Sequence, residues 1–203
     1  MKILIYFITL FIFSTFAFAC DNKNSDINFN KENNMNNDNM PNNPQYAYFS
    51  SGCFWGVEYW FEKAEGVFSA ISGYAGGHKA NPTYIEVCTG LTGHLETVKV
   101  GYDADKTTYE DLIKLFFETH NFTQKNGQGP DIGSQYLSAI FYQNEEEKEI
   151  AEKYINILKE KGFDVATTLR EFKNFYEAED YHQDYYSKKA STPYCHFYNK
   201  IFE

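Results

Sequence analysis

The thiols of this chain are Cys20, Cys53, Cys88 and Cys195, and each has a different setting. Their wide spacing does not indicate a dense disulfide scaffold, and no CxxC pair occurs. The surroundings of each cysteine must therefore decide whether it reacts, anchors or packs.

Cys53 has the setting of a reactive thiol. A predicted strand ends before it, Gly52 permits a tight turn, and a helix is expected to begin at Cys53. Backbone N–H groups and the helix dipole at such a position favour a thiolate, which is the reactive form in displacement and redox chemistry. Phe54 and Trp55 follow directly, so an aromatic wall should stand beside the sulfur. The competing interpretation is an inert, buried cysteine.

Glu96 is the candidate acid. Residues 93–102 alternate as a strand, and one face carries Glu96 together with Val98, Val100 and Tyr102. A carboxyl group on this apolar face loses hydration, which raises its pKa and keeps it protonated near neutral pH, as a general acid requires. The alternative is a glutamate at a frayed strand end that leans into water.

Asp131 and Tyr136 flank the junction between a Gly-rich loop and a predicted strand. Loop residues at strand ends often carry function, although this junction is also explained by turn chemistry alone. Cys88 falls in a short segment, 85–88, that is expected to be helical, and we predict a core position for it.

The elements that must position these residues alternate between strands and helices without strict repetition. Strands are expected near residues 46–51, 67–74, 93–102, 135–142 and 165–169. Helices are expected near residues 53–65, 144–161 and 179–189, with a further one opened by a capping box of Thr107 and Glu110. This order favours an α+β domain with one mixed sheet.

The composition is that of a folded, acidic protein. The 203 residues include 19 Phe and 17 Tyr, enough to build a core without disulfides. The formal charge of −10 argues against binding to nucleic acid phosphates.

Residues 1–19 have the pattern of a signal peptide, with Lys2 before an apolar run and small residues before Cys20. Cys20 resembles the acceptor cysteine of bacterial lipoproteins, whose acyl chains anchor them to a membrane; ordinary cleavage that leaves Cys20 unmodified is the alternative. Residues 20–44 are polar and Asn-rich, as is typical of a disordered tether. We therefore expect an exported, extracytoplasmic lipoprotein with a folded domain at residues 45–203.

Six motifs follow one another along this domain: Gly52-Cys53-Phe54-Trp55-Gly56, Ser72-Gly73-Tyr74-Ala75-Gly76-Gly77, Asn81-Pro82-Thr83-Tyr84, Thr92-Gly93-His94 with Glu96, Asp131-Ile132-Gly133-Ser134-Gln135-Tyr136, and Ala178-Glu179-Asp180-Tyr181-His182-Gln183. Through them the domain resembles the A-type peptide methionine sulfoxide reductases over roughly residues 46–198. It departs from the usual family pattern at Asn121-Phe122, where Asp-Pro is common, and at Leu137, where a basic residue is common. The resemblance implies a single α+β domain with a mixed, mostly antiparallel sheet packed with helices, a ferredoxin-like α/β sandwich.

The resemblance also implies an activity, the reduction of the S epimer of methionine sulfoxide, free or in proteins, as a repair of oxidative damage. Cys53 would attack the sulfoxide sulfur and become a sulfenic acid, while Glu96 would protonate the oxygen. Tyr84 and Tyr136 would hydrogen-bond this oxygen as charge builds on it, and Asp131 would support the polar network.

The same resemblance assigns Phe54 and Trp55 to the substrate methyl group. Cys195 is similar in position to the family's resolving cysteine, which would form a disulfide with Cys53 that a thioredoxin-like reductant opens. No metal or organic cofactor is implied, and we expect a monomer whose partners are methionine sulfoxide, this reductant and, through Cys20, the membrane.

Two other interpretations compete. A zinc site drawn from Cys53, Cys88, Cys195 and the histidines matches no usual ligand spacing. A non-catalytic ligand-binding lipoprotein explains the tether and the aromatic content, but it does not explain a glycine-flanked cysteine followed by two aromatic residues.

Overall fold

The structure, a computed structural model, describes residues 40–202. The expected signal peptide, Cys20 and the tether as far as residue 39 lie outside the described residues. The elements run in this order: β1 (Pro44–Ser51), α1 (Phe54–Glu62), β2 (Val67–Ala75), α2 (Tyr84–Cys88), β3 (Leu95–Asp103), α3 (Tyr109–Glu118), β4 (Gly127–Gln128), β5 (Asp131–Ile132), the 3₁₀ turn η2 (Ser134–Tyr136), β6 (Ser138–Tyr142), α4 (Glu145–Glu160), β7 (Thr168–Glu171), β8 (Phe175–Glu177) and α5 (Tyr185–Lys189).

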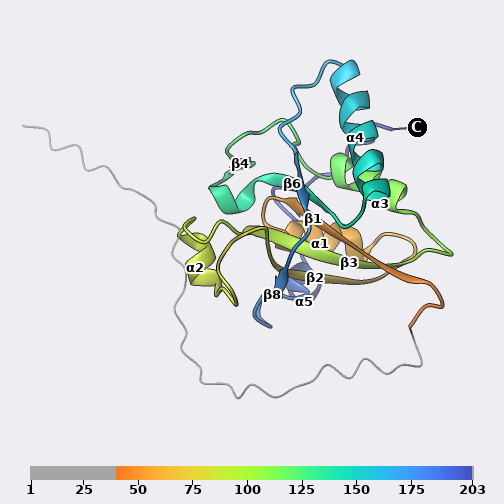
Figure 1. Ribbon diagram of the computed structural model, residues 1–203. Coiled ribbons are helices and arrows are strands. Elements are labelled where there is room, and N and C mark those ends of the chain that lie inside the picture. The colour runs from red at the N-terminus through yellow and green to blue at the C-terminus, as the bar shows by residue number, and fades with distance from the viewer. Residues whose placement is uncertain (1–39, 203) are drawn as a thin grey trace, which may run out of the picture. The chain divides into compact units, whose positions relative to one another are not determined.

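A six-stranded sheet has the order β7-β6-β1-β3-β2-β8, and β4 pairs with β5 in a separate small hairpin. The pairing within the large sheet is antiparallel except between β6 and β7, which run parallel. The central strands β1, β2, β3 and β6, together with α1 and α3, follow the β-α-β-β-α-β order of the ferredoxin-like fold (Figure 1). The predicted α+β fold with a mixed, mostly antiparallel sheet is confirmed.

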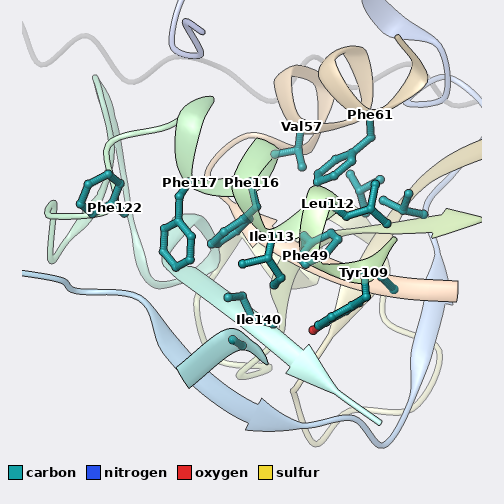
Figure 2. Packing of buried hydrophobic residues seen from close by; sticks show 14 of the residues in the cluster. Phe49, Val57, Phe61, Tyr109, Leu112, Ile113, Phe116, Phe117, Phe122 and Ile140 are labelled. Atoms are coloured by element: carbon teal, nitrogen blue, oxygen red, sulfur yellow. The ribbon is translucent and has the colours of Figure 1, made fainter. Parts of the chain in front are cut away.

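The main core lies between one face of this sheet and the helices. Phe49 of β1 stacks on Phe61 of α1 at a ring distance of 5.0 Å and contacts Phe116 of α3 at 5.4 Å. Figure 2 shows Val57 and Phe61 pointing from α1 toward the side chains of α3. Alternation along β1 sends Tyr48 to the opposite face, where it stacks on Phe172 at 3.9 Å. Packing of its apolar side chains therefore holds α1 against the sheet, and Cys53 lies at the start of this helix.

Several expected boundaries were wrong. The cap of α3 is Thr108, whose hydroxyl accepts from the N–H of Asp111, rather than Thr107 with Glu110. Residues 134–136 form a 3₁₀ turn, so the strand expected from 135 begins at Ser138. The strand expected at 165–169 lies at Thr168–Glu171.

The segment before the last helix also differs from expectation. The helix expected over 179–189 is confined to Tyr185–Lys189, because Asp184 has a left-handed φ of 53° and ends a turn there. Strand β8, which was not predicted, pairs with β2 just before this turn.

The C-terminal residues are part of the packed domain. Oε1 of Glu118, at the end of α3, accepts from the backbone N–H groups of Ile201 and Phe202 at 2.8 Å each. The Phe202 side chain is buried in the main core. Within residues 40–202, no helix combines the length and apolar character needed to cross a membrane.

Candidate functional site

The turn between β1 and α1 places Cys53 at the first cap position of the helix. Gly52 adopts a φ of 102°, and a Cβ atom there would lie 2.4 Å from Cβ of Gln128, so both conformation and space require glycine. The Cys53 side chain is 7% exposed, so its sulfur sits at the floor of the site rather than on an open surface.

Cys53 is held as a thiol, and the prediction of a resting thiolate was wrong. Burial raises its pKa well above the usual range, and the nearby Glu96 and Cys195 raise it further. A hydrogen bond from the backbone of Trp55 lowers the pKa, as the helix N-terminus argument requires, but its effect is smaller. The sequence shows that a helix begins at Cys53, but it does not show that the thiol is buried, and burial has the larger effect on the pKa.

Glu96 lies beside this turn on β3. Its side chain is 1% exposed, and Oε2 accepts from the backbone N–H of Phe54 at 3.0 Å. The pKa of Glu96 is raised to about 8. Burial is the main cause and Asp131 adds to it, while the hydrogen bond from Phe54 acts in the opposite direction. The prediction of a buried carboxyl group with a raised pKa is confirmed, and the group carries a proton near neutral pH.

Tyr84 and Tyr136 approach the same carboxyl group from α2 and η2. Burial and the nearby Glu96 raise the pKa of both phenols, so both remain O–H donors. Cys88 lies half-buried, and its side chain interacts with Tyr84 and Tyr136. It does not join the hydrophobic core, so its predicted core position was wrong.

An aromatic group surrounds Phe54 and Trp55. The Phe54 ring is buried and lies 4.9 Å from the His182 ring, while Trp55 stacks on Tyr185 at 3.6 Å. Nε1 of Trp55 donates to Nδ1 of His182 at 3.1 Å. Burial lowers the pKa of His182 to about 4, so the imidazole is neutral and packs as a flat, largely apolar wall.

The C-terminal segment closes the other side of the site. Both carboxyl oxygens of Asp131 accept from the Tyr194 hydroxyl at 3.1 Å, and the Asp131 side chain also hydrogen-bonds Cys195. Burial raises the pKa of Asp131 and raises that of Cys195 to about 12. Cys53 and Cys195 are both reduced and buried, and Cys195 lies close enough to raise the pKa of Cys53.

No role in the reaction was predicted for Glu179, His182, Tyr194 or His196, and the two histidines entered only as candidate ligands of the zinc alternative. Glu179 accepts from the Tyr74 hydroxyl at 2.8 Å and from the backbone N–H of Tyr84 at 2.9 Å, which fixes the start of α2. Glu179 and His182 belong to a motif that was recognised but not interpreted, and a histidine directly after Cys195 was a signal in itself.

The cysteines and histidines of the zinc alternative form no group of three or more ligands within residues 40–202. Within residues 40–202, the side chains placed closely enough to share an ion are Glu58, Glu62 and Asp184, a set without cysteine or histidine. The arrangement that remains is a buried thiol, a protonated carboxyl group, two phenol donors and an aromatic wall. Such a set can deliver a nucleophilic sulfur and a proton to one small polar group.

Comparison with known proteins agrees with this geometry. Residues 45–203 match the family model described as peptide methionine sulfoxide reductase. Over 152 residues the chain is 49% identical to peptide methionine sulfoxide reductase MsrA of Natronomonas pharaonis, covering 73% of this chain and 85% of the relative.

Solved structures share the fold. Reduced Mxr1 from Saccharomyces cerevisiae superposes with a TM-score of 0.72 at 32% identity, covering 79% of this chain and 94% of that one. Methionine sulfoxide reductase A of Corynebacterium diphtheriae gives 0.66 at 36% identity, covering 73% and 76%. The chain therefore belongs to the peptide methionine sulfoxide reductase family, in its MsrA class.

Proposed function

We propose that this enzyme reduces the S epimer of methionine sulfoxide through attack by Cys53 and proton donation by Glu96. The observation that carries the proposal is the protonated, buried carboxyl group of Glu96, bonded to the amide of the residue that follows Cys53. Nucleophile and acid are thereby fixed next to each other before substrate arrives, which is the arrangement that lowers the entropic part of a barrier.

The oxygen of the substrate is the group that needs help. Glu96 donates its proton to this oxygen as Sγ of Cys53 attacks the sulfoxide sulfur, and the thiol proton replaces the one that Glu96 has given. Tyr84 and Tyr136 donate hydrogen bonds to the oxygen as its charge grows. Attack joins Sγ of Cys53 to the methionine sulfur, and the oxygen, protonated a second time through Glu96, leaves as water. Water then adds to Sγ and returns a proton to Glu96 while the bond between the two sulfur atoms breaks, which releases methionine. Overall, thiol plus sulfoxide gives sulfenic acid plus thioether, so the methionine sulfur gains two electrons and the Cys53 sulfur loses two.

The aromatic group selects the substrate. Phe54 and Trp55, backed by His182 and Tyr185, offer an apolar surface for the terminal methyl group of methionine sulfoxide. Asp131 supports the polar side of the site through its contacts with Tyr194 and Cys195. Substrates of this kind include the free amino acid and exposed residues of oxidised proteins.

Cys195 is the proposed resolving cysteine. Its thiol condenses with the Cys53 sulfenic acid to give a disulfide and water, and a thioredoxin-like dithiol then reduces that disulfide. A groove of about 460 Å³ reaches Cys195, with Phe122, Pro130 and Phe197 in its lining, and the Phe197 ring is exposed. This apolar approach suits a dithiol protein partner. This catalytic cycle takes its electrons from thiols and uses no bound metal or organic cofactor.

Export completes the proposal. The signal pattern of residues 1–19 and the lipoprotein-like position of Cys20 support an enzyme that works outside the cytoplasm, tethered by residues 20–44. Mass spectrometry of the mature protein from membranes tests this: a diacylated Cys20 at the N-terminus is expected. An intact Met1 would refute export, and an unmodified Cys20 would leave secretion without an anchor.

The activity is tested by a single turnover. Reduced Cys195→Ser protein is mixed with a peptide carrying either epimer of methionine sulfoxide, in the presence of dimedone, which labels sulfenic acids. We expect one methionine per protein from the S epimer, and the label on Cys53. Cys53→Ser should form none, although it should fold, because a hydroxyl is a far weaker nucleophile in this setting. Methionine formed by Cys53→Ser, or a label elsewhere, would contradict the assignment.

A further inference from the structure

His196 is buried between the C-terminal segment and the start of α1. It is 1% exposed, and Nε2 lies 2.7 Å from the backbone carbonyl oxygen of Ser51. A carbonyl oxygen can only accept, so Nε2 must carry the hydrogen. In the neutral imidazole the free lone pair is therefore on Nδ1.

This lone pair faces a cysteine. Nδ1 of His196 lies 3.1 Å from Sγ of Cys195, so this lone pair can accept the hydrogen of the thiol. Burial lowers the pKa of His196 to about 4, and the bond to Ser51 opposes this. The ring is thus neutral, with its acceptor nitrogen aimed at the sulfur, throughout the physiological pH range.

The same ring packs closely against the first turn of α1, next to Cys53. A Cβ atom on Gly56 would lie 2.2 Å from Nδ1 of His196, so only glycine at this position lets the imidazole approach α1 so closely. Nε1 of Trp60 also donates to the His196 carbonyl oxygen, at 3.4 Å. One side chain thereby touches both the segment of the nucleophile and the second thiol.

We propose that His196 is a catalytic base that removes the proton of Cys195 as this thiol attacks the sulfenic acid of Cys53. The inference rests on the proposed function, in which Cys195 resolves that sulfenic acid. The proton moves from Sγ of Cys195 to Nδ1, a bond forms between the two sulfur atoms, and the S–O bond at Cys53 breaks. The departing oxygen takes the proton back from the imidazolium and leaves as water, so thiol plus sulfenic acid gives disulfide plus water.

The thiol needs such a base. Burial, and then the Asp131 carboxylate, raise the pKa of Cys195 to about 12. At neutral pH only about one molecule in 10⁵ would hold a thiolate without assistance, and the thiolate is the attacking form. Asp131 is the rival acceptor, because it also contacts the thiol. His120 is a further titratable group near His196, and burial lowers its pKa to about 3, so it stays neutral.

His196→Gln separates the base from the anchor. The glutamine amide nitrogen can take the place of Nε2 and donate to the Ser51 carbonyl, but no basic nitrogen faces Cys195. Reduced protein is mixed rapidly with a methionine sulfoxide peptide and quenched at intervals, and methionine and the Cys53–Cys195 disulfide are quantified separately by mass spectrometry. We expect methionine to appear as in the wild type, while the disulfide forms at least about 100-fold more slowly at pH 7.

The pH dependence gives a second measurement that needs no variant. With His196 as base, the wild-type rate of disulfide formation is level between about pH 6 and 9, because the reacting pair is neutral thiol and neutral imidazole. In His196→Gln the rate should rise about tenfold per pH unit as free thiolate becomes available. A tenfold rise per unit in the wild type would overturn the proposal whether or not the variant folds.

Controls separate the possible failures. His120→Gln removes another buried imidazole, whose two ring nitrogens bond to the Phe116 carbonyl and the Ser138 hydroxyl, and it should leave the disulfide rate unchanged. A wild-type rate in His196→Gln, with a slow rate in Asp131→Asn, would overturn the proposal in favour of the carboxylate. If the wild type forms methionine but no Cys53–Cys195 disulfide, the resolving step of the proposed function fails instead.

Discussion

The backbone N–H of Phe54 donates to Oε2 of Glu96 at 3.0 Å, which ties the residue after Cys53 to a carboxyl group on a strand 42 positions away. This bond leaves Oε1 without the Phe54 donor, so in the proposed mechanism Oε1 is the oxygen that carries the acidic proton. A single main-chain bond thus sets the spacing between Cys53 and Glu96.

Glu96→Gln should slow the first methionine while leaving the fold intact. The amide oxygen can still accept from Phe54, but the side chain has no acidic proton to give. Loss of a general acid typically costs about 10²- to 10⁴-fold, so we expect a fall of this size in single-turnover methionine formation. Glu179→Gln, which changes a carboxylate outside hydrogen-bond reach of Cys53, serves to compare effects on folding by thermal unfolding. An unchanged rate in Glu96→Gln would rule this residue out as the acid.

The rate of the first step should depend on pH with a sign that Glu96 sets. Its folded pKa is about 8, so the acid form is complete well below that pH and is lost as the pH rises through it. Measured below substrate saturation, methionine formation should be level near pH 6 to 7 and fall about tenfold per unit above pH 8. A rate that climbs through pH 8 would mean that ionisation of Cys53, rather than proton donation, limits the reaction.

Tyr136→Phe and Tyr84→Phe each remove one donor to the sulfoxide oxygen. Loss of one such donor in other enzymes costs about 100-fold in rate, because charge on the oxygen is greatest in the transition state. We expect each variant to slow single-turnover methionine formation by about this factor with little change in half-saturation. Tyr142→Phe, on β6 away from Glu96, is the matched control and should react normally. An equal loss in all three variants would point to a general effect on folding.

Glu58→Gln should remove part of the pH dependence of stability. Glu58 is 1% exposed, and burial raises its pKa to about 8, although hydrogen bonds from the Asp184 backbone and from Ser72 oppose this rise. The folded state therefore holds this proton where the unfolded state releases it, so the free energy of unfolding falls as pH rises from about 4.5 to 8. The glutamine variant should lose this decline, which is on the order of a few kcal/mol. Urea unfolding at pH 5 and pH 8 measures the effect, with the exposed Glu146→Gln as control. The prediction is contradicted if the free energy of unfolding falls between these pH values by the same amount in Glu58→Gln and in the wild type.

The parts of the fold that follow from local pattern were predictable. The helix expected from Cys53 is present as α1, and the alternation around Glu96 predicted both β3 and its buried carboxyl group. The helix expected near residues 144–161 is present as α4, and the Asn144 side chain caps it by accepting from the N–H of Glu147. In each case the signal lies within a few residues of the element that it predicts.

The errors share a different origin. Strand β8 is three residues long and exists because it pairs with β2, a partner about a hundred positions earlier in the chain. The thiolate at Cys53 was expected from the helix start alone, while its pKa is set mainly by burial and by Glu96. The contact between the His196 ring and Gly56 depends on where the C-terminal segment packs, which the local sequence does not indicate. Local sequence carries no record of such long-range neighbours.

The anchoring of Ile201 and Phe202 by Glu118 has a consequence for how this protein folds. Because the Phe202 ring belongs to the main core, the domain completes its core only when the segment that contains Cys195 has docked. The two thiols at Cys53 and Cys195 are therefore brought together by folding itself, before any substrate is met.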